Sequence, residues 1–175
     1  MTTPHKEITS GLKFPEGPVA MPDGSKIEEK VFPLERPNGC GLSPDEKTLY
    51  VVETPTARCW AFKLSGPGQI ESANGPYRGE KGTVITGLPG YQMFDSLAVD
   101  GEGHICVATL ITGAVSDIWP DGSRVDQYML PDMMVTNVCF GGRDLRTAYA
   151  TLSMGGTLVS FEWPRPGLPL RYLSR

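Results

Sequence analysis

The chain has 175 residues, of which 39% are hydrophobic and 21% are charged, and its formal net charge is −4. This length suits one ordinary domain, and this composition excludes a chain that is disordered throughout. The sequence has no basic run and no apolar stretch of membrane-spanning length, so we expect neither a nucleic-acid partner nor a membrane partner.

The N-terminal segment and the cysteines indicate the compartment. The segment MTTPHKEITSG is polar and lacks the apolar core of a secretory signal. No C-x-x-C pair occurs, which argues against a zinc knuckle and a thioredoxin-like motif. Cys40, Cys106 and Cys139 lie in apolar, strand-like stretches, so we expect buried, reduced thiols there. Together these features predict a cytoplasmic protein.

The local pattern predicts an all-β fold. Runs such as TLYVVE, HICVATL and TAYATL are rich in β-formers and alternate with turns that contain Gly, Pro and Asp. No apolar stripe with helical period extends beyond about two turns.

Four similar segments recur along the chain, beginning at Glu16, Asn38, Asp95 and Asn137. An acidic residue follows each starting residue at the same spacing: Asp23, Asp45, Glu102 and Asp144. The last three segments lead into an apolar strand. Units of roughly 40–50 residues, each a strand, a tight polar turn and further strands, are typical of the blades of a β-propeller.

The first unit departs from this pattern, because Asn38 follows Glu16 after only about half a blade. We therefore expect a single propeller-type domain over residues 1–175, with about three blades plus an N-terminal strand segment. The break in the pattern predicts an internal deletion near residues 25–26. A propeller needs about four to eight blades to close. Uncovered blade faces predict self-association of so short a chain.

Several stretches, in order along the chain, resemble the gluconolactonase, senescence-marker-protein and luciferin-regenerating-enzyme family. They are GLKFPEGPVAMPDGS, RPNGCGLSPDEKTLYVVET, FDSLAVDGEGHICVA and TNVCFGGRDLRTAYATL. The resemblance implies a six-bladed propeller with a divalent metal in its central channel, here as an incomplete member of the family. The sequence departs from the family pattern at Ser96, where Gly is usual, and at Cys40, where an aliphatic residue is common.

Carried over by motif, the resemblance implies three metal ligands, Glu16, Asn38 and Asp95. Two carboxylates and an amide are hard oxygen donors, which favour Ca²⁺, with Zn²⁺, Mg²⁺ or Mn²⁺ as alternatives. Taken without the resemblance, the same residues could be turn and strand-start residues that bond to backbone. In a propeller the innermost strands surround one axis, so their first side chains can converge although they are far apart in sequence.

Three further residues can each be interpreted as part of a substrate site or as structural, and a fourth is interpreted as structural only. Tyr91 and Phe94 precede Asp95 and either wall a substrate pocket or pack against the sheet. Asn137 shares the repeat position, so it either lines the channel beside the substrate or caps backbone. His104 follows a Gly-Glu-Gly turn, where we expect an exposed turn residue.

The resemblance implies a lactonase that opens sugar lactones or related cyclic esters. The metal would polarise the lactone carbonyl, and Asp95 would be the general base toward water. The alternative is a non-catalytic, shortened propeller that binds a partner or itself, and a third reading is a deletion variant or faulty gene model of a longer enzyme. Triad, P-loop and dinucleotide motifs are absent from the sequence.

Overall fold

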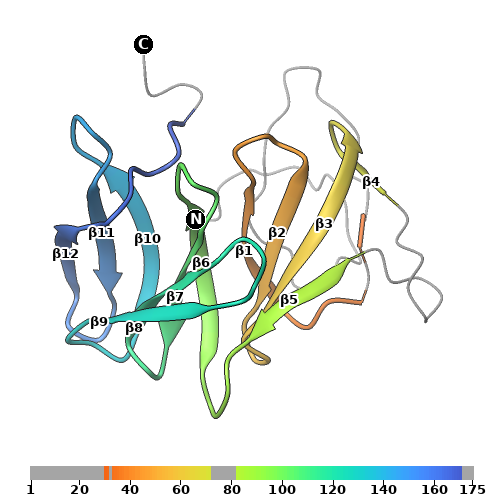
Figure 1. Ribbon diagram of the computed structural model, residues 1–175. Coiled ribbons are helices and arrows are strands. Elements are labelled where there is room, and N and C mark those ends of the chain that lie inside the picture. The colour runs from red at the N-terminus through yellow and green to blue at the C-terminus, as the bar shows by residue number, and fades with distance from the viewer. Residues whose placement is uncertain (1–29, 32, 72–81, 171–175) are drawn as a thin grey trace, which may run out of the picture.

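The computed structural model describes residues 30–31, 33–71 and 82–170 and contains three antiparallel β-sheets (Figure 1). The described residues form strands, turns and irregular segments and no helix. The predicted all-β fold is therefore confirmed. The predicted deletion near residues 25–26 and the first segment, with Glu16, lie outside the described residues.

Each sheet is built from strands that follow one another along the chain. The first sheet has the order β1-β2-β3-β4, with β5 paired to β3, and contains β1 (Pro37–Leu42), β2 (Thr48–Glu53), β3 (Arg58–Gly66), β4 (Gln69–Ile70) and β5 (Thr83–Gly87). The middle sheet contains β6 (Met93–Val99), β7 (Ile105–Leu110), β8 (Ala114–Ile118) and β9 (Val125–Met129). The third sheet contains β10 (Val135–Gly141), β11 (Thr147–Leu152) and β12 (Thr157–Glu162).

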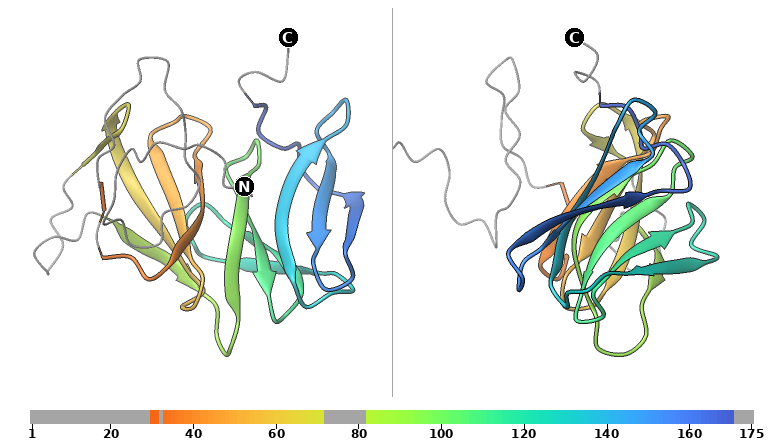
Figure 2. Two further views of the ribbon diagram at one scale, coloured as in Figure 1. Left: turned by 180° about the vertical axis from the view of Figure 1, so that it is seen from behind. Right: turned by 90° about the vertical axis from the view of Figure 1, so that its left-hand side faces the viewer.

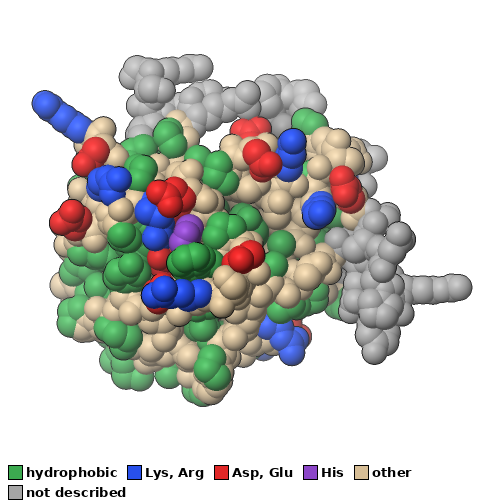
Figure 3. Space-filling view, in the orientation of Figure 1, with side chains coloured by type: hydrophobic (Ala, Val, Ile, Leu, Met, Phe, Trp, Pro, Cys, Tyr) green, Lys and Arg blue, Asp and Glu red, His purple; other side chains and the backbone are tan. Residues whose placement is uncertain are grey.

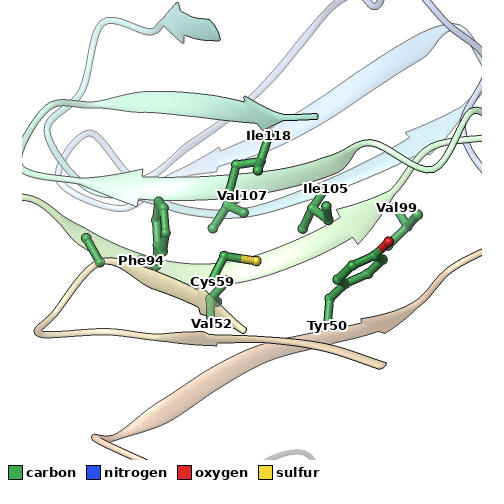
Figure 4. Close-up of a cluster of buried hydrophobic side chains, with 9 residues drawn as sticks. Tyr50, Val52, Cys59, Phe94, Val99, Ile105, Val107 and Ile118 are labelled. Carbon is green, nitrogen blue, oxygen red and sulfur yellow. The ribbon is translucent and has the colours of Figure 1, made fainter. Parts of the chain in front are cut away.

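The three sheets stand side by side, as Figure 2 shows from behind. Their first strands are neighbours, because β6 contacts β1 on one side and β10 on the other. One apolar cluster lies between the first and middle sheets and includes Tyr50, Val52, Phe94 and Val107 (Figure 4). A second cluster lies between the middle and third sheets. This is the arrangement of successive propeller blades, with one strand of each lining the inside.

The middle sheet is packed on both faces, which explains its sequence. Every residue of β7 and β8 is buried, and these strands read as nearly continuous apolar runs. In β12, by contrast, half-buried residues alternate with exposed ones. A strand packed on one face only needs an apolar side chain at every second position.

Acidic side chains close the tight turns, as the repeat predicts, but with one exception. Asp45 accepts a hydrogen bond from Lys47 N at 3.1 Å, and Asp144 accepts one from Arg146 N at 3.1 Å. In the middle sheet Asp100 takes this part in place of Glu102. Its Oδ1 accepts the backbone N–H groups of Glu102 and His104 at 3.0 and 2.9 Å.

The segment after β12 returns to the middle sheet. Trp163 is fully buried in the second cluster, beside the rings of Tyr128 and Phe140. Beyond it, Gly101 N donates to Pro166 O at 2.7 Å and Leu168 N donates to Val99 O at 3.2 Å. These contacts join the third sheet to the end of β6.

The burial of two groups of residues differs from expectation. Cys59 and Cys106 are buried, but Cys40 and Cys139 are exposed, because both lie on inner strands with no apolar cluster over them. His104 was expected to be an exposed turn residue and is only 7% exposed. The reason is its side chain, which is hydrogen-bonded to the buried Asp117 and lies against the ring of Trp119.

A search of the described residues for a helix of sufficient length and hydropathy to cross a membrane finds none.

Candidate metal and substrate site

The candidate site begins with an irregularity that all three inner strands share. In β1 the strand pairing shifts between Pro37, which faces Glu53, and Cys40, which faces Val51. Asn38 and Gly39 therefore stand opposite one residue of β2. This is a β-bulge, which turns side chains out of the regular alternation and is common beside active sites.

The same irregularity occurs in β6, where Phe94 faces Thr109 and Leu97 faces Val107. The two residues in its bulge are Asp95 and Ser96. In β10 the shift lies between Val135 and Asn137 and adds Thr136 as the extra residue. The residues predicted to be ligands in the first and middle sheets thus occupy matching bulges.

The two bulges bring Asn38 and Asp95 together. Asn38 Nδ2 donates to Asp95 Oδ1 at 2.8 Å, and the same nitrogen lies 3.4 Å from Thr54 Oγ1. Both the amide and the carboxylate are half-buried. Thr54 was missed in the sequence, although a hydroxyl residue directly after the strand TLYVVE is a visible signal.

Gly39 makes this approach sterically feasible. A Cβ atom at this position would lie 2.5 Å from Leu97 N and 2.8 Å from Asp95 O. Backbone atoms cannot move aside as a flexible side chain can. The absence of a side chain at Gly39 therefore sets the distance between the bulges of β1 and β6.

The donor set of this pair fits a hard divalent cation. A carboxylate and an amide offer oxygen ligands without a thiolate or an imidazole. In the observed contact the amide nitrogen of Asn38 faces Asp95, so the amide must turn over to present its oxygen to a cation held there. The third predicted ligand, Glu16, lies outside the described residues.

The other predicted site residues lie in different environments. Tyr91 is 68% exposed, and Phe94 is fully buried in the first apolar cluster, to which Cys59 and Val107 also belong (Figure 4). Asn137 is exposed, and its Oδ1 accepts the N–H of Val138 at 2.8 Å. Their part in substrate binding stays a prediction.

A pocket of about 620 Å³ opens beside the inner strands. Side chains from β1, β6 and β10 and from the segment after β12 line it, among them Cys40, Leu97, Cys139 and Leu168. Cys40 stands two positions after Asn38 on β1. The pocket thus places a largely apolar surface along the same strands that carry the polar pair.

A second group of metal-type side chains lies at the other end of the middle sheet. One ligand atom each from Asp100, Cys106 and Asp117 lies within 4.8 Å of the others. Arg165 already places a positive charge on both carboxylates of this group. Its Nε donates to Asp100 Oδ2 and its Nη2 donates to Asp117 Oδ2, both at 2.5 Å.

The environments of His104 and Cys106 also argue that this group is held together by ion pairs and does not bind a metal. His104 Nδ1 lies 2.8 Å from Asp117 Oδ1, and Figure 3 shows acidic, basic and hydrophobic side chains around a histidine on this face. Burial raises the pKa of the Cys106 thiol well above its ordinary value, so a thiolate ligand is disfavoured. Asp100, His104, Asp117 and Arg165 therefore form an ionic network. In this network the positive charge that a metal ion would bring comes from the Arg165 guanidinium.

Comparison with known proteins gives relatives whose names describe lactone hydrolysis. The chain is 31% identical over 119 residues to Pentonolactonase XacC of Haloferax volcanii, covering 68% of this chain and 38% of that protein. It is 32% identical over 132 residues to the 6-deoxy-6-sulfogluconolactonase of Pseudomonas putida, covering 74% of this chain and 43% of that protein. The chain thus spans less than half the length of these curated relatives.

Solved structures show the same fold. A calcium-binding protein, regucalcin, from Agrobacterium tumefaciens matches with a TM-score of 0.58 at 26% identity, covering 77% of this chain and 47% of that chain. A gluconolactonase from Xanthomonas campestris matches with a TM-score of 0.63 at 24% identity, covering 82% and 42%, which supports the fold alone. The three sheets are therefore part of a lactonase-type propeller. Residues 2–154 match the family described as the SMP-30/Gluconolactonase/LRE-like region, and the chain belongs to this family.

Proposed function

We propose that this chain carries part of the site of a metal-dependent lactonase that opens sugar lactones or related cyclic esters. The observation that carries the proposal is the contact between Asn38 and Asp95, made by matching bulges in a chain of this family. The names of the relatives supply the substrate class.

Asn38, Asp95 and Glu16 would hold the metal, with Ca²⁺ preferred, and the bound ion would polarise the lactone carbonyl. Asp95 would accept a proton from the water that attacks this carbonyl. Asn38 would add an oxygen ligand without adding charge, and before metal binding its Nδ2 orients the carboxylate by donating to Asp95 Oδ1 at 2.8 Å. The half-buried setting of both residues keeps the carboxylate reachable by water while limiting its rotation.

The test is Asp95→Asn, which keeps the shape of the side chain and removes its charge. We expect δ-gluconolactone hydrolysis to fall by about 10²–10⁴-fold, the usual contribution of a general base. We also expect weaker binding of Ca²⁺, measured by calorimetry. The control is Asp126→Asn, since Asp126 is a partly exposed residue of β9 that pairs with Arg124, directly before this strand. Equal hydrolysis by Asp95→Asn and the unchanged protein would refute the role of Asp95.

A second candidate function, a binding or self-associating module, is favoured by the outer face of the third sheet. Among the described residues no further sheet covers this face. It presents Tyr149 and the 67% exposed Leu158 on the neighbouring strands β11 and β12. Such a face favours association with another surface.

A further inference from the structure

The repeated bulge allows the three inner strands to be matched residue by residue. The pairs directly before the bulges correspond: Pro37–Glu53, Phe94–Thr109 and Val135–Leu152. Beyond the bulges the pairs Cys40–Val51, Leu97–Val107 and Val138–Ala150 correspond, and β10 has one additional pair, Asn137–Thr151, before the last of these. In this register the first bulge residue is Asn38 in β1, Asp95 in β6 and Thr136 in β10.

This register differs from the alignment that the sequence repeat gave for Asn137. The regular spacing of acidic residues aligned Asn137 with Asn38 and Asp95, but in the strand register Asn137 lies one position later and pairs with Thr151. Its counterparts are Gly39 and Ser96. A Cβ atom at Gly39 would meet backbone atoms of the adjoining sheet, so at Gly39 this position lies against the next blade.

The hydrogen bonds support the same correspondence. Asn38 contacts Thr54, the residue after Glu53, and Thr136 Oγ1 lies 2.9 Å from the hydroxyl of Ser153, the residue after Leu152. Glu53 and Leu152 are equivalent partners in the register. In both sheets, therefore, the first bulge side chain contacts a hydroxyl at the end of the second strand.

Thr136 belongs to a set of three hydroxyl groups. Its Oγ1 lies 2.8 Å from Thr151 Oγ1 in addition to the contact with Ser153. Three hydroxyls have three O–H donors, and two contacts use two of them. One donor and several lone pairs are left to meet a ligand. Thr136 is half-buried and Ser153 is exposed, so the set can be reached from solvent.

We propose that Thr136 is a substrate-binding residue that recognises a hydroxyl group on the ring of a hydroxylated lactone, an inference that rests on the proposed lactonase function. Its neutral hydroxyl is a weak metal ligand compared with a carboxylate, so ligation is not its part. Since β10 lies beside β6, the hydroxyl set flanks the strand that carries Asp95. A sugar lactone is a ring ester that carries hydroxyls. Its ester would be placed near Asp95, and one of its ring hydroxyls would bond to Thr136.

The test compares two six-membered lactones, δ-gluconolactone, which carries hydroxyls, and δ-valerolactone, which carries none. Thr136→Val keeps the shape of the side chain and removes its hydroxyl. We expect kcat/KM for δ-gluconolactone to fall about five- to tenfold, the effect of one lost hydrogen bond, and kcat/KM for δ-valerolactone to stay unchanged. The matched control is Thr147→Val at the other end of β11, which should change neither.

Equal losses on both lactones, or no loss on either, would overturn the inference, because a structural role does not distinguish the substrates. Binding of 1,5-anhydro-D-glucitol, a hydroxylated ring without an ester, separates this inference from the lactonase proposal. If the unchanged protein hydrolyses neither lactone but binds this sugar with an affinity that Thr136→Val lowers, the lactonase proposal fails and the recognition of hydroxyls stands. A protein that neither hydrolyses the lactones nor binds the sugar refutes both.

Discussion

The four cysteines divide into two exposed and two buried thiols, and this difference predicts their reactivity. Cys40 and Cys139 face the pocket beside the inner strands, whereas Cys59 and Cys106 lie inside the apolar clusters. Burial raises the pKa of Cys59 to about 12, so this thiol stays protonated at neutral and mildly alkaline pH. A protonated thiol is a poor nucleophile.

We therefore expect a disulfide reagent such as DTNB to modify Cys40 and Cys139 rapidly in the folded protein. Cys59 and Cys106 should react only in denaturing guanidinium chloride. The control is the double variant Cys40→Ser and Cys139→Ser, in which the rapid phase should vanish. Fast modification of all four thiols under native conditions would contradict the packing of both clusters.

Gly39 provides a second test at the scale of one residue. Gly39→Ala places a methyl group against Leu97 N and Asp95 O, so the bulges of β1 and β6 must move apart. We expect a loss of about 1–3 kcal/mol in the free energy of unfolding, the usual effect of overpacking, measured by urea denaturation. Gly66→Ala is the control, because nothing lies within 4 Å of a Cβ atom there. Equal stabilities of the two variants would argue against the close approach.

Among the structural elements, the segment after β12 depends on the ionic network. Arg165 supplies the positive charge that contacts both Asp100 and Asp117, whose side chains are 0% and 1% exposed. Burial opposes the charge of the guanidinium, but its hydrogen bonds to Asp117 and Asp100 outweigh burial and raise the pKa of Arg165. Arg165 therefore stays charged at neutral and alkaline pH.

Arg165→Met should destabilise the protein by about 3–5 kcal/mol, because it leaves two buried carboxylates without their cation. The matched control is Arg124→Met, which removes an exposed pair with Asp126 and should cost about 0–1 kcal/mol. Urea denaturation of both variants measures the difference. Similar losses in the two would mean that the network contributes no more than a surface ion pair.

The strands were predictable from the sequence because apolar runs and Asp-containing turns are local features. The meeting of Asn38 with Asp95 followed from the family motifs together with the convergence of inner strands. The equivalence of Thr136 with Asn38 and Asp95 could not be predicted in this way, because the hairpin loops of the repeats differ in length. Leu42 pairs with Leu49 in the first sheet, but Gly141 pairs with Thr147 in the third. Counting back from the acidic turn therefore misplaces the third bulge by one residue.

The ionic network was also beyond sequence reasoning. His104 and Asp100 lie in one turn, but Arg165 is 65 residues from Asp100, and no local pattern joins them. The turn Gly-Glu-Gly-His reads as exposed because its residues are polar or small. Only the return of the chain after β12 supplies the cation that allows Asp100 and Asp117 to be buried.

For the whole molecule, the open face of the third sheet predicts self-association. The exposed Leu158 lies beside Thr151 on this face, and Tyr149 lies on the same face. We expect light scattering after gel filtration to give a mass above that of one chain. Leu158→Lys should lower this mass. Met129→Lys is the control, because Met129 is 62% exposed but lies on β9 of the middle sheet. A single-chain mass for the unchanged protein would refute the prediction.

The return of the chain to the middle sheet also has a consequence for the order of folding. Consecutive strands close short loops at little entropic cost, so the hairpins of each sheet form early. The contact between Asn38 and Asp95 spans 57 residues and needs only the first two sheets. Arg165 is synthesised later still. On the ribosome, the polar pair of the candidate site can therefore assemble while Asp100 and Asp117 remain hydrated, and these carboxylates become buried only when the last segment docks.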